Sequence, residues 1–246
     1  MLSSFETGFT AAVIGASGGI GRAVTALLAA DPAVAEVRAF TRSGAPPQSD
    51  KVRPGRLDLT EEASLAAAAQ ALAGSDRLRL VFVASGLLHD GAGLQPEKNW
   101  AALDSAQLLR AYQVNAVGPA LLAKHLLPLL PREGKAVFAA ISARVGSIED
   151  NALGGWYGYR ASKAALNMLL RNLAIELGRR RKQAICVGLH PGTVDTALSK
   201  PFQGAVQPGK LFTPEVSAGH LLKVIDGLTP ADSGQLFAWD GQRIPF

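Results

Sequence analysis

The chain has 246 residues and is poor in several features that define whole classes of protein. It has one cysteine, Cys186, so no disulfide can form within the chain, and the reducing cytoplasm is its expected location. Its four histidines are scattered, and neither cysteines nor clustered carboxylates accompany them, so no metal site is expected. Residues 120–128 form the most apolar stretch, but Lys124, His125 and Pro128 interrupt it well short of a membrane span.

Acidic residues are outnumbered by basic ones, which raises the alternative of a nucleic-acid partner. The formal net charge is +5, and residues 179–182, Arg-Arg-Arg-Lys, form the obvious basic cluster. The cluster follows the apolar run at residues 169–175, so cations near a helix C-terminus, where the helix dipole favours them, explain it more simply. We therefore expect no nucleic-acid partner, and a nucleic-acid-binding module remains a rival that rests on net charge alone.

Apolar runs typical of strands alternate with segments of helical period along the chain. Strands are predicted at residues 11–15, 37–41, 78–84, 135–142 and 184–189. Helices are predicted at residues 63–72, 106–130 and 157–180, and after the first strand, where Ile20, Val24, Leu27 and Leu28 form one apolar stripe. Because the strands are continuous apolar runs, both faces of their sheet are expected to be covered. The sequence thus predicts a single doubly wound α/β domain with a parallel sheet, of the Rossmann type, over residues 1–246.

The first predicted strand runs directly into a glycine-rich turn, Gly15-Ala16-Ser17-Gly18-Gly19-Ile20-Gly21. Glycines permit a close approach of the backbone, and the N-terminus of the next helix offers unpaired N–H groups to a pyrophosphate. The glycines fit two spacings, Gly-x-x-x-Gly-x-Gly and Gly-x-x-Gly-x-x-Gly. The order of strand, turn and amphipathic helix predicts a dinucleotide site, with a plain flexible turn as the alternative.

The second predicted strand ends in Phe40-Thr41-Arg42-Ser43. A site selective for NADH would place an acidic side chain here to hold the adenosine ribose. No carboxylate is present to repel a 2′-phosphate, and the planar guanidinium of Arg42 is suited to bind one. The sequence therefore predicts NADPH over NADH, the alternative being an arginine that only points into solvent.

Tyr159 and Lys163 are one helical turn apart in Tyr-Arg-Ala-Ser-Lys. A free tyrosine has a pKa near 10, and a neighbouring ammonium favours its phenolate, so the pair can donate a proton. Such a spacing alone is common on solvated helix faces. Its place after a dinucleotide turn makes the pair a candidate for general acid catalysis.

With these motifs in order, the sequence resembles the short-chain dehydrogenase/reductase family over essentially its whole length. Asp58 matches the aspartate that meets the adenine ring, and Asn115 matches the catalytic asparagine. Tyr159 and Lys163 match the acid and its partner, and residues 191–196 resemble the loop that holds the nicotinamide carboxamide. The cofactor site that the resemblance implies contains Gly15, Ser17, Gly19, Ile20, Gly21, Thr41, Arg42, Asp58, Ser85, Gly86, Lys163, Pro191, Gly192, Val194 and Thr196.

Within the family, residues 143–148 and 154–157 resemble the branch of C-factor-type signalling proteins and sniffer-type carbonyl reductases. The chain length argues against the longer epimerase-like branch and favours the first glycine spacing. The resemblance implies NADP(H) as cofactor and a small-molecule carbonyl compound, an aldehyde, ketone or quinone, as substrate. It also implies a homo-oligomer, because the predicted helices at 106–130 and 157–180 match those that pair subunits in many relatives.

In the reaction that the resemblance implies, Tyr159 donates its proton to the substrate carbonyl as the hydride of NADPH arrives. Lys163 supplies the nearby cation and hydrogen-bonds the nicotinamide ribose, while Asn115 holds a water that links Lys163 to solvent. A serine hydroxyl normally steadies the carbonyl oxygen.

Two departures from the family pattern affect these expectations. Residues 83–86, Val-Ala-Ser-Gly, replace the usual Asn-Asn-Ala-Gly and lose its polar side chains. Counting back from Gly146, the catalytic serine falls on Ala143, with Ser142 one residue earlier and Ser147 after the turn. Because neighbours on a strand point to opposite faces, Ser142 substitutes only if a bulge or the strand end re-aims it, a core role being the alternative. The loss motivates a second hypothesis, a cofactor-binding signalling protein with little turnover.

Residues 197–212, with two prolines and two glycines, are predicted to be a mobile loop over the substrate. Its Leu198, Phe202 and Leu211 favour an apolar ligand. Trp156 is expected either to wall the substrate pocket or to serve in packing or a subunit contact.

Overall fold

An eight-stranded sheet lies at the centre of the computed structural model, which describes residues 2–74, 77–90 and 93–246. The strands are β1 (Phe9–Ile14), β2 (Val34–Thr41), β3 (Val52–Arg56), β4 (Leu78–Val83), β5 (Ala136–Ile141), β6 (Ala184–His190), β9 (Leu236–Ala238) and β10 (Arg243–Ile244). Their order is β10-β9-β6-β5-β4-β1-β2-β3, and neighbouring pairs are parallel except β9 with β10. The sheet is therefore parallel almost throughout, as predicted.

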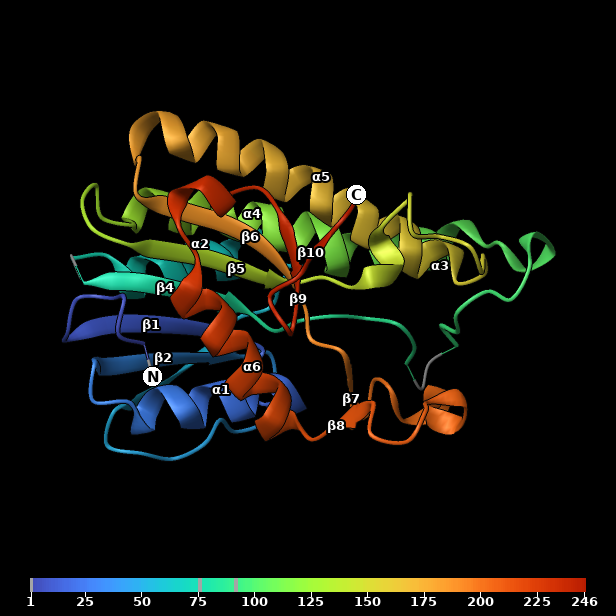
Figure 1. Cartoon of the computed structure of the whole chain (residues 1–246), viewed down its shortest axis with the longest axis horizontal. Coiled ribbons are helices and arrows are strands. Elements are labelled where there is room, and N and C mark those ends of the chain that lie inside the picture. Colours follow the sequence, from blue (N-terminus) through green and yellow to red (C-terminus); the bar gives the residue numbers. More distant parts are fainter. Residues whose placement is uncertain (1, 75–76, 91–92) are drawn as a thin grey trace.

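Helices cover both faces of this sheet (Figure 1). On one face lie α1 (Gly19–Ala30) and α6 (Pro214–Gly227); on the other lie α2 (Glu62–Leu72), α4 (Gly118–Leu126) and α5 (Tyr157–Arg180), and α3 (Ser105–Tyr112) packs against α5. Successive side chains of β1 pack on opposite faces of the sheet. Ala11 and Val13 pack with α1 and α6, whereas Ala12 and Ile14 pack with the helices on the other face. The doubly wound α/β prediction is thus confirmed.

α5 ends in the basic cluster at residues 179–182. There Arg181 donates hydrogen bonds to the backbone carbonyls of Leu130 and Pro128, at 2.6 and 2.7 Å. The cations thus lie at a helix C-terminus, as predicted. In the part of the chain that the structure describes, no helix combines the length and apolar character needed to cross a membrane.

The helix predicted over residues 106–130 is divided in the structure. α3 leads through a π-helical turn, Gln113–Val117, into α4, and a 3-10 helix at Leu127–Leu129 follows. π-Helical turns are rare and occur mostly at functional sites. Asn115 lies in this one.

Three strands of the eight-stranded sheet, and the α-helix α6, lie outside the predicted elements. β3 reads Val-Arg-Pro-Gly-Arg and buries Val52 alone, so it has no apolar run, and its proline is tolerated because the strand is at the sheet edge. β9 and β10 are three and two residues long. α6 begins at Pro214, where the Thr213 side chain accepts a hydrogen bond from the backbone N–H of Val216.

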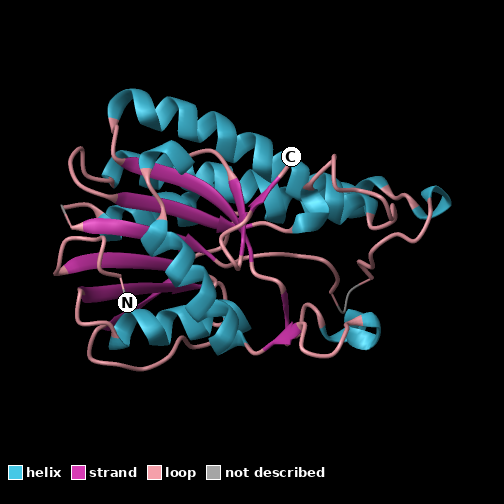
Figure 2. Cartoon of the chain, in the orientation of Figure 1, coloured by secondary structure: helices cyan, strands magenta, loops and turns pink. Residues whose placement is uncertain are grey.

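The carboxyl ends of the parallel strands β1, β4, β5 and β6 all lie at the same end of the sheet. The loops that follow these strands gather at this carboxyl end (Figure 2), together with a small sheet of β7 (Thr193–Val194) and β8 (Leu211–Phe212). Sheets of this type bind their ligands at the carboxyl ends of their strands. The fold therefore brings together the sequence motifs that follow these strands.

Phe138, in the middle of β5, is fully buried among side chains of the α2, α4 and α5 layer. We expect Phe138→Ala to lower the free energy of unfolding by about 3–5 kcal/mol, because it leaves a cavity that the packed sheet cannot fill. Denaturant titration followed by circular dichroism measures this loss. Leu153→Ala, at a side chain that is 91% exposed, is the control, and equal midpoints for both variants would contradict the assigned core.

Candidate active site

The glycine-rich turn between β1 and α1 is packed too tightly for other residues. Gly15 has a φ of +83°, and a Cβ built on it would lie 2.9 Å from the carbonyl oxygen of Ala84. A Cβ on Gly21 would lie 2.1 Å from the carbonyl oxygen of Gly15. α1 begins at Gly19 with no capping side chain and no acidic residue in its first turn. Its first N–H groups are therefore free to bind an anion such as a pyrophosphate.

The loop after β2 lies against this turn. Ser17 Oγ donates to the Ser43 carbonyl at 3.1 Å, and Arg22 donates to the Ala45 carbonyl at 2.7 Å. Within the described residues, Arg42 makes no hydrogen bond or ion pair, so its guanidinium is available to a phosphate. The tight turn, the open helix end and the free guanidinium together fit a dinucleotide phosphate.

Asp58, in the loop after β3, lies close to the same region. Burial acts to raise the pKa of its carboxyl, but hydrogen bonds from the Thr60 backbone and hydroxyl, and the charges of Arg42 and Arg56, lower it overall. The carboxylate is thus held ionised beside the loop that carries Arg42.

A cavity of about 440 Å³ adjoins the N-terminus of α1. Its walls include eleven of the predicted catalytic and cofactor-binding residues, namely Gly19, Ile20, Ser85, Gly86, Ser142, Tyr159, Lys163, Pro191, Gly192, Val194 and Thr196. The other candidates lie in the glycine-rich turn, at the end of β2, in the loops after β2 and β3, and in the π-helical turn. Among the described residues, no group of three His, Cys, Asp or Glu side chains could hold a metal ion.

Tyr159 and Lys163 lie in the first two turns of α5 and line this cavity. Lys163 Nζ is 5.8 Å from the centroid of the Tyr159 ring and donates a 2.9 Å hydrogen bond to the Ile141 carbonyl at the end of β5. Burial lowers the pKa of Lys163 to about 7 and raises the pKa of Tyr159 to about 12. The site therefore holds a protonated phenol beside an amine that titrates near neutral pH.

Asn115, in the π-helical turn, is fully buried. Its Oδ1 accepts a hydrogen bond from the Leu87 backbone at 2.7 Å, and its Nδ2 donates to the Leu87 carbonyl and to Ser162 Oγ, at 2.8 and 3.0 Å. A Cβ built on Gly86 would lie 3.8 Å from Lys163 Nζ. The Asn115 amide thus ties the loop after β4 to α5 and keeps that loop against Lys163.

No serine occupies the position where the family pattern expects one. Ala143 lines the cavity in an extended conformation, with no bulge to re-aim its neighbours. Ser142 is in the wall, but its hydroxyl donates to Asn167 Oδ1 at 2.7 Å, so in this arrangement the proton is not available to a substrate. Ser147 lies outside the cavity lining, and its Oγ accepts a hydrogen bond from the Asp150 backbone.

Among the described residues, two buried polar atoms at the cavity find no hydrogen-bond partner, Ser85 Oγ and His190 Nδ1. Burial, and then the charge of Arg144, lower the pKa of His190 to about 4, so this imidazole is neutral. Unsatisfied buried groups are uncommon in folded proteins, and at a cavity wall they favour a polar ligand. Ser85 was expected in the cofactor site, whereas His190 was not among the predicted residues.

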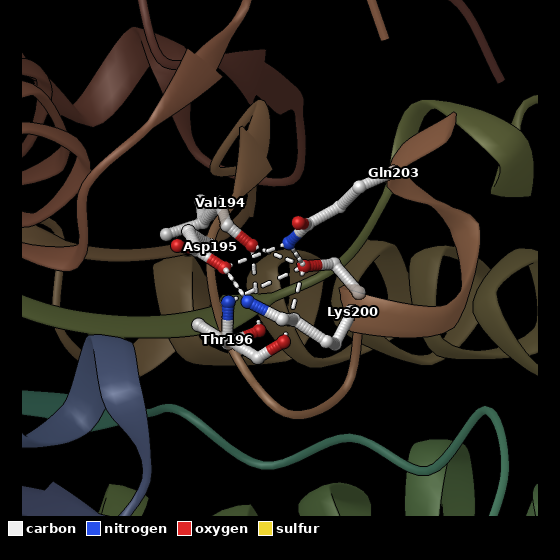
Figure 3. A network of polar contacts seen from close by, with 6 residues as sticks. Val194, Asp195, Thr196, Lys200 and Gln203 are labelled. Carbon is white, nitrogen blue, oxygen red and sulfur yellow. Dashed lines mark hydrogen bonds and ion pairs between the residues drawn. The ribbon is translucent and has the colours of Figure 1, made fainter. Parts of the chain in front are cut away.

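The segment after β6 covers the cavity and contains short regular elements. It forms a 3-10 helix at Lys200–Ala205 and then β8, so the region predicted as a loop over residues 197–212 is not irregular throughout. Figure 3 shows the polar network that holds it, in which Gln203 donates to Asp195 Oδ1 at 2.9 Å and Lys200 pairs with the same oxygen at 3.9 Å. Leu198 and Phe202 line the cavity, whereas Leu211 is not among the lining residues.

Glu97, which the sequence did not single out, comes from the loop after β4 and packs against the N-terminal end of α5. Its buried carboxylate accepts hydrogen bonds from the backbone N–H of Gly158, the closer at 3.1 Å, and its carbonyl accepts one from Trp156 at 2.6 Å. A carboxylate at a helix N-terminus is stabilised by the helix dipole. No local pattern identifies this role, because the partners lie about sixty residues further along the chain.

Comparison with known proteins agrees with this geometry. Residues 10–206 match the family model described as short chain dehydrogenase. The chain belongs to the short-chain dehydrogenase family. Its matched residues extend from β1 to the covering segment after β6, so they include the turn, Asn115, Tyr159 and Lys163.

Several short-chain dehydrogenase relatives and structures resemble the chain closely. C-signal of Myxococcus xanthus is 37% identical over 150 residues, 60% of this chain and 85% of the relative. The 1-hydroxy-2-glutathionyl-2-methyl-3-butene dehydrogenase of Rhodococcus sp. strain AD45 is 37% identical over 192 residues, 77% of this chain and 78% of the relative. NADPH-bound carbonyl reductase from chicken fatty liver has a TM-score of 0.84 and 26% identity, over 99% of this chain and 97% of that chain. The predicted resemblance to C-factor-type proteins and sniffer-type carbonyl reductases is confirmed.

The glycine-rich turn of this short-chain dehydrogenase gives a direct test. We expect Gly21→Ala to weaken nicotinamide dinucleotide binding at least about tenfold, because the added Cβ meets the Gly15 carbonyl and must open the turn. Calorimetric titration with NADPH and with NADH measures the change. Gly219→Ala, in α6 with open space around the new methyl group, is the matched control and should bind as the parent does.

Proposed function

We propose that this short-chain dehydrogenase uses NADPH to reduce an aldehyde, ketone or quinone, and that Tyr159 donates the proton. The observation that carries the proposal is the position of Tyr159 and Lys163 in a cavity that adjoins the N-terminus of α1. When bound there, NADPH would supply a hydride from C4 of its nicotinamide, and NADP⁺ would result together with an alcohol from an aldehyde or ketone, or a hydroquinone from a quinone.

Tyr159 would give its hydroxyl proton to the carbonyl oxygen as the new C–H bond forms. Its raised pKa keeps the phenol protonated at neutral pH until a substrate accepts the proton. Lys163, beside the ring, would stabilise the phenolate that remains and would hydrogen-bond the nicotinamide ribose. The Asn115 side chain is already hydrogen-bonded to Leu87 and Ser162. The water proposed to link Lys163 to solvent would therefore bind the backbone of the π-helical turn instead of this side chain.

The free guanidinium of Arg42 supports NADPH over NADH. It follows β2, at the end of the strand where an NADH site would carry a carboxylate, and a 2′-phosphate would pair with it. The structurally similar chicken carbonyl reductase was solved with NADPH bound. The other proposed cofactor contacts come from the glycine-rich turn, Thr41, Asp58, the residues at Ser85 and Gly86, and the loop after β6: Pro191, Gly192, Val194 and Thr196.

Ala143 motivates a second candidate function. Without a hydroxyl there, the carbonyl oxygen would lack one donor, and Ser142 would serve only after its proton turned from Asn167. A protein that binds NADP(H) as a signal, with little turnover, would tolerate this loss. The similarity to C-signal supports this alternative, which predicts tight NADPH binding without oxidation of any carbonyl compound.

We also propose that the chain forms a homo-oligomer in the cytoplasm. The interacting helices α3, α4 and α5, with the π-helical turn, expose Leu109, Val117, Met168 and Ile175, which are apolar side chains suited to a second copy. The one cysteine is buried, which suits a reducing compartment.

Substitution of the proposed proton donor tests the function. We expect Tyr159→Phe to lower kcat for NADPH-dependent carbonyl reduction by about 10²–10⁴-fold, because the phenylalanine ring fills the space but has no proton to give. NADPH oxidation across a panel of aldehydes, ketones and quinones measures this. Tyr157→Phe, two residues earlier and outside the cavity lining, should keep the parent rate. An equal rate for Tyr159→Phe would refute the assignment, and tight NADPH binding without turnover in the parent would favour the signalling alternative.

Reversal of the charge at Arg42 tests the cofactor preference. We expect Arg42→Asp to raise the Kd for NADPH by about 10–100-fold and to leave the Kd for NADH unchanged or lower, because a carboxylate repels a 2′-phosphate and accepts ribose hydroxyls. Fluorescence titration with both nucleotides checks this. Arg179→Asp makes the same charge change at the far end of α5 and is the control. A parent that binds NADH more tightly than NADPH would contradict the preference.

A further inference from the structure

Trp156 forms one wall of the cavity directly beside Tyr159. Its ring centroid is 6.2 Å from that of Tyr159 and 5.0 Å from that of Phe202, and both contacts are edge-to-face. Trp156 precedes α5, whereas Phe202 comes from the covering 3-10 helix. Two elements that are distant in the sequence therefore bring aromatic rings together next to the proposed proton donor.

The backbone of Trp156 is held in a conformation that its side chain does not favour. Its φ is +52°, and among the described residues it is the only one outside glycine with a positive φ. Gly154 and Gly155, just before it, are also left-handed, and the Glu97 carbonyl accepts the Trp156 N–H at 2.6 Å. A glycine would adopt this backbone without strain, so the tryptophan contributes its ring at a conformational cost. Such strain is typical of functional sites.

Phe202 is fixed from the other side by contacts of the covering segment. His89, in the loop after β4, has Nε2 at 3.2 and 3.1 Å from the carbonyl oxygens of Ala197 and Leu198, so this nitrogen carries the proton and donates it. The His89 ring meets the Phe202 ring edge-on, with centroids 5.6 Å apart. The aromatic wall of Trp156 and Phe202 is thus preformed rather than assembled by a ligand.

The rest of the cavity near these rings is apolar and offers little charge to a substrate. Leu88, Val145, Leu198 and Val206 line it. Of the described lining residues, Lys163 and Arg144 carry a formal charge, and Arg144 is paired with Asp150 at 3.1 Å. A substrate would therefore be recognised by ring packing and burial rather than by an ion pair.

We propose that the substrate is an aromatic aldehyde or ketone whose ring packs against Trp156 and Phe202 while its carbonyl oxygen meets Tyr159. Trp156 is then a specificity-determining residue. The inference rests on the proposed function for the reduction itself, but the aromatic subsite has its own readout, because it would also bind aromatic compounds that cannot be reduced.

The test compares benzaldehyde with cyclohexanecarbaldehyde, which have similar size but differ in ring character. The parent, Trp156→Gly and Phe202→Leu are assayed for kcat and KM with both aldehydes, and glycine is chosen at 156 because it fits the positive φ. We expect each variant to lower the ratio of kcat/KM, benzaldehyde over cyclohexanecarbaldehyde, by about tenfold and mainly through KM. The change in this ratio cancels the intrinsic difference in reactivity between the aldehydes.

Binding of non-reducible analogues separates this inference from the proposed function. Ligand-observed NMR titration of the NADPH-loaded protein with benzamide and cyclohexanecarboxamide should show tighter benzamide binding in the parent, weakened in Trp156→Gly. Trp100→Gly, at a tryptophan that is 77% exposed, should behave as the parent in both assays. If the parent reduces no carbonyl compound but shows this binding pattern, the proposed function is refuted and the aromatic subsite is supported. Equal binding of the two amides by the parent, or benzamide binding that Trp156→Gly leaves unchanged, overturns the subsite whether or not reduction occurs. Unchanged kcat/KM ratios in both variants overturn it where reduction occurs.

Discussion

The buried ammonium of Lys163 is the constraint on which the arrangement of the site depends. Its hydrogen bond to the Ile141 carbonyl joins α5 to the end of β5, and no carboxylate pairs with it in the part of the chain that the structure describes. Removing this charge from water without an ionic partner is costly, which is why burial lowers its pKa to about 7. Ribose hydroxyls and a phenolate are the partners that would relieve this cost. Cofactor binding and proton donation by Tyr159 are thereby linked through one side chain.

Departures from regular structure surround this side chain. The π-helical turn sets Asn115 behind it, and three left-handed residues, Gly154, Gly155 and Trp156, lead into the helix that carries it. The Glu97 carboxylate accepts a hydrogen bond from the backbone N–H of Gly158 at the same helix end. Each departure is held by contacts with segments far away in the sequence, so the surrounding fold supplies the stability that local propensity does not. The proposed acid, its cation and Trp156 are therefore all positioned by the N-terminal end of α5.

The features that could be predicted from the sequence are those whose signal is local. The buried strands are continuous apolar runs, the tight turn requires its glycines, and Tyr159 and Lys163 are one turn apart on a single helix. Glu97 and Asn167 carry no such signal, because their partners are brought close only by the folded sheet and α5, and the place of His190 at the cavity wall likewise depends on the sheet. β3 escaped prediction for a different reason, since an edge strand need not be apolar. The missing hydroxyl at Ala143 could be read from the sequence, whereas the hydrogen bond that Ser142 makes to Asn167 could not.

The pH dependence of carbonyl reduction tests the role of Lys163 most directly. The rate would be measured at NADPH concentrations far below KM, where it reports the free enzyme, from about pH 5 to pH 9 for the parent and for Lys163→Met. Tyr159, with a pKa of about 12, stays protonated over this range, whereas Lys163, with a pKa of about 7, loses its positive charge as the pH rises. We expect a parent rate that is high below pH 7 and falls above it, and a slower variant with no inflection near pH 7. A parent rate that is flat or rises through neutral pH would contradict this role of Lys163.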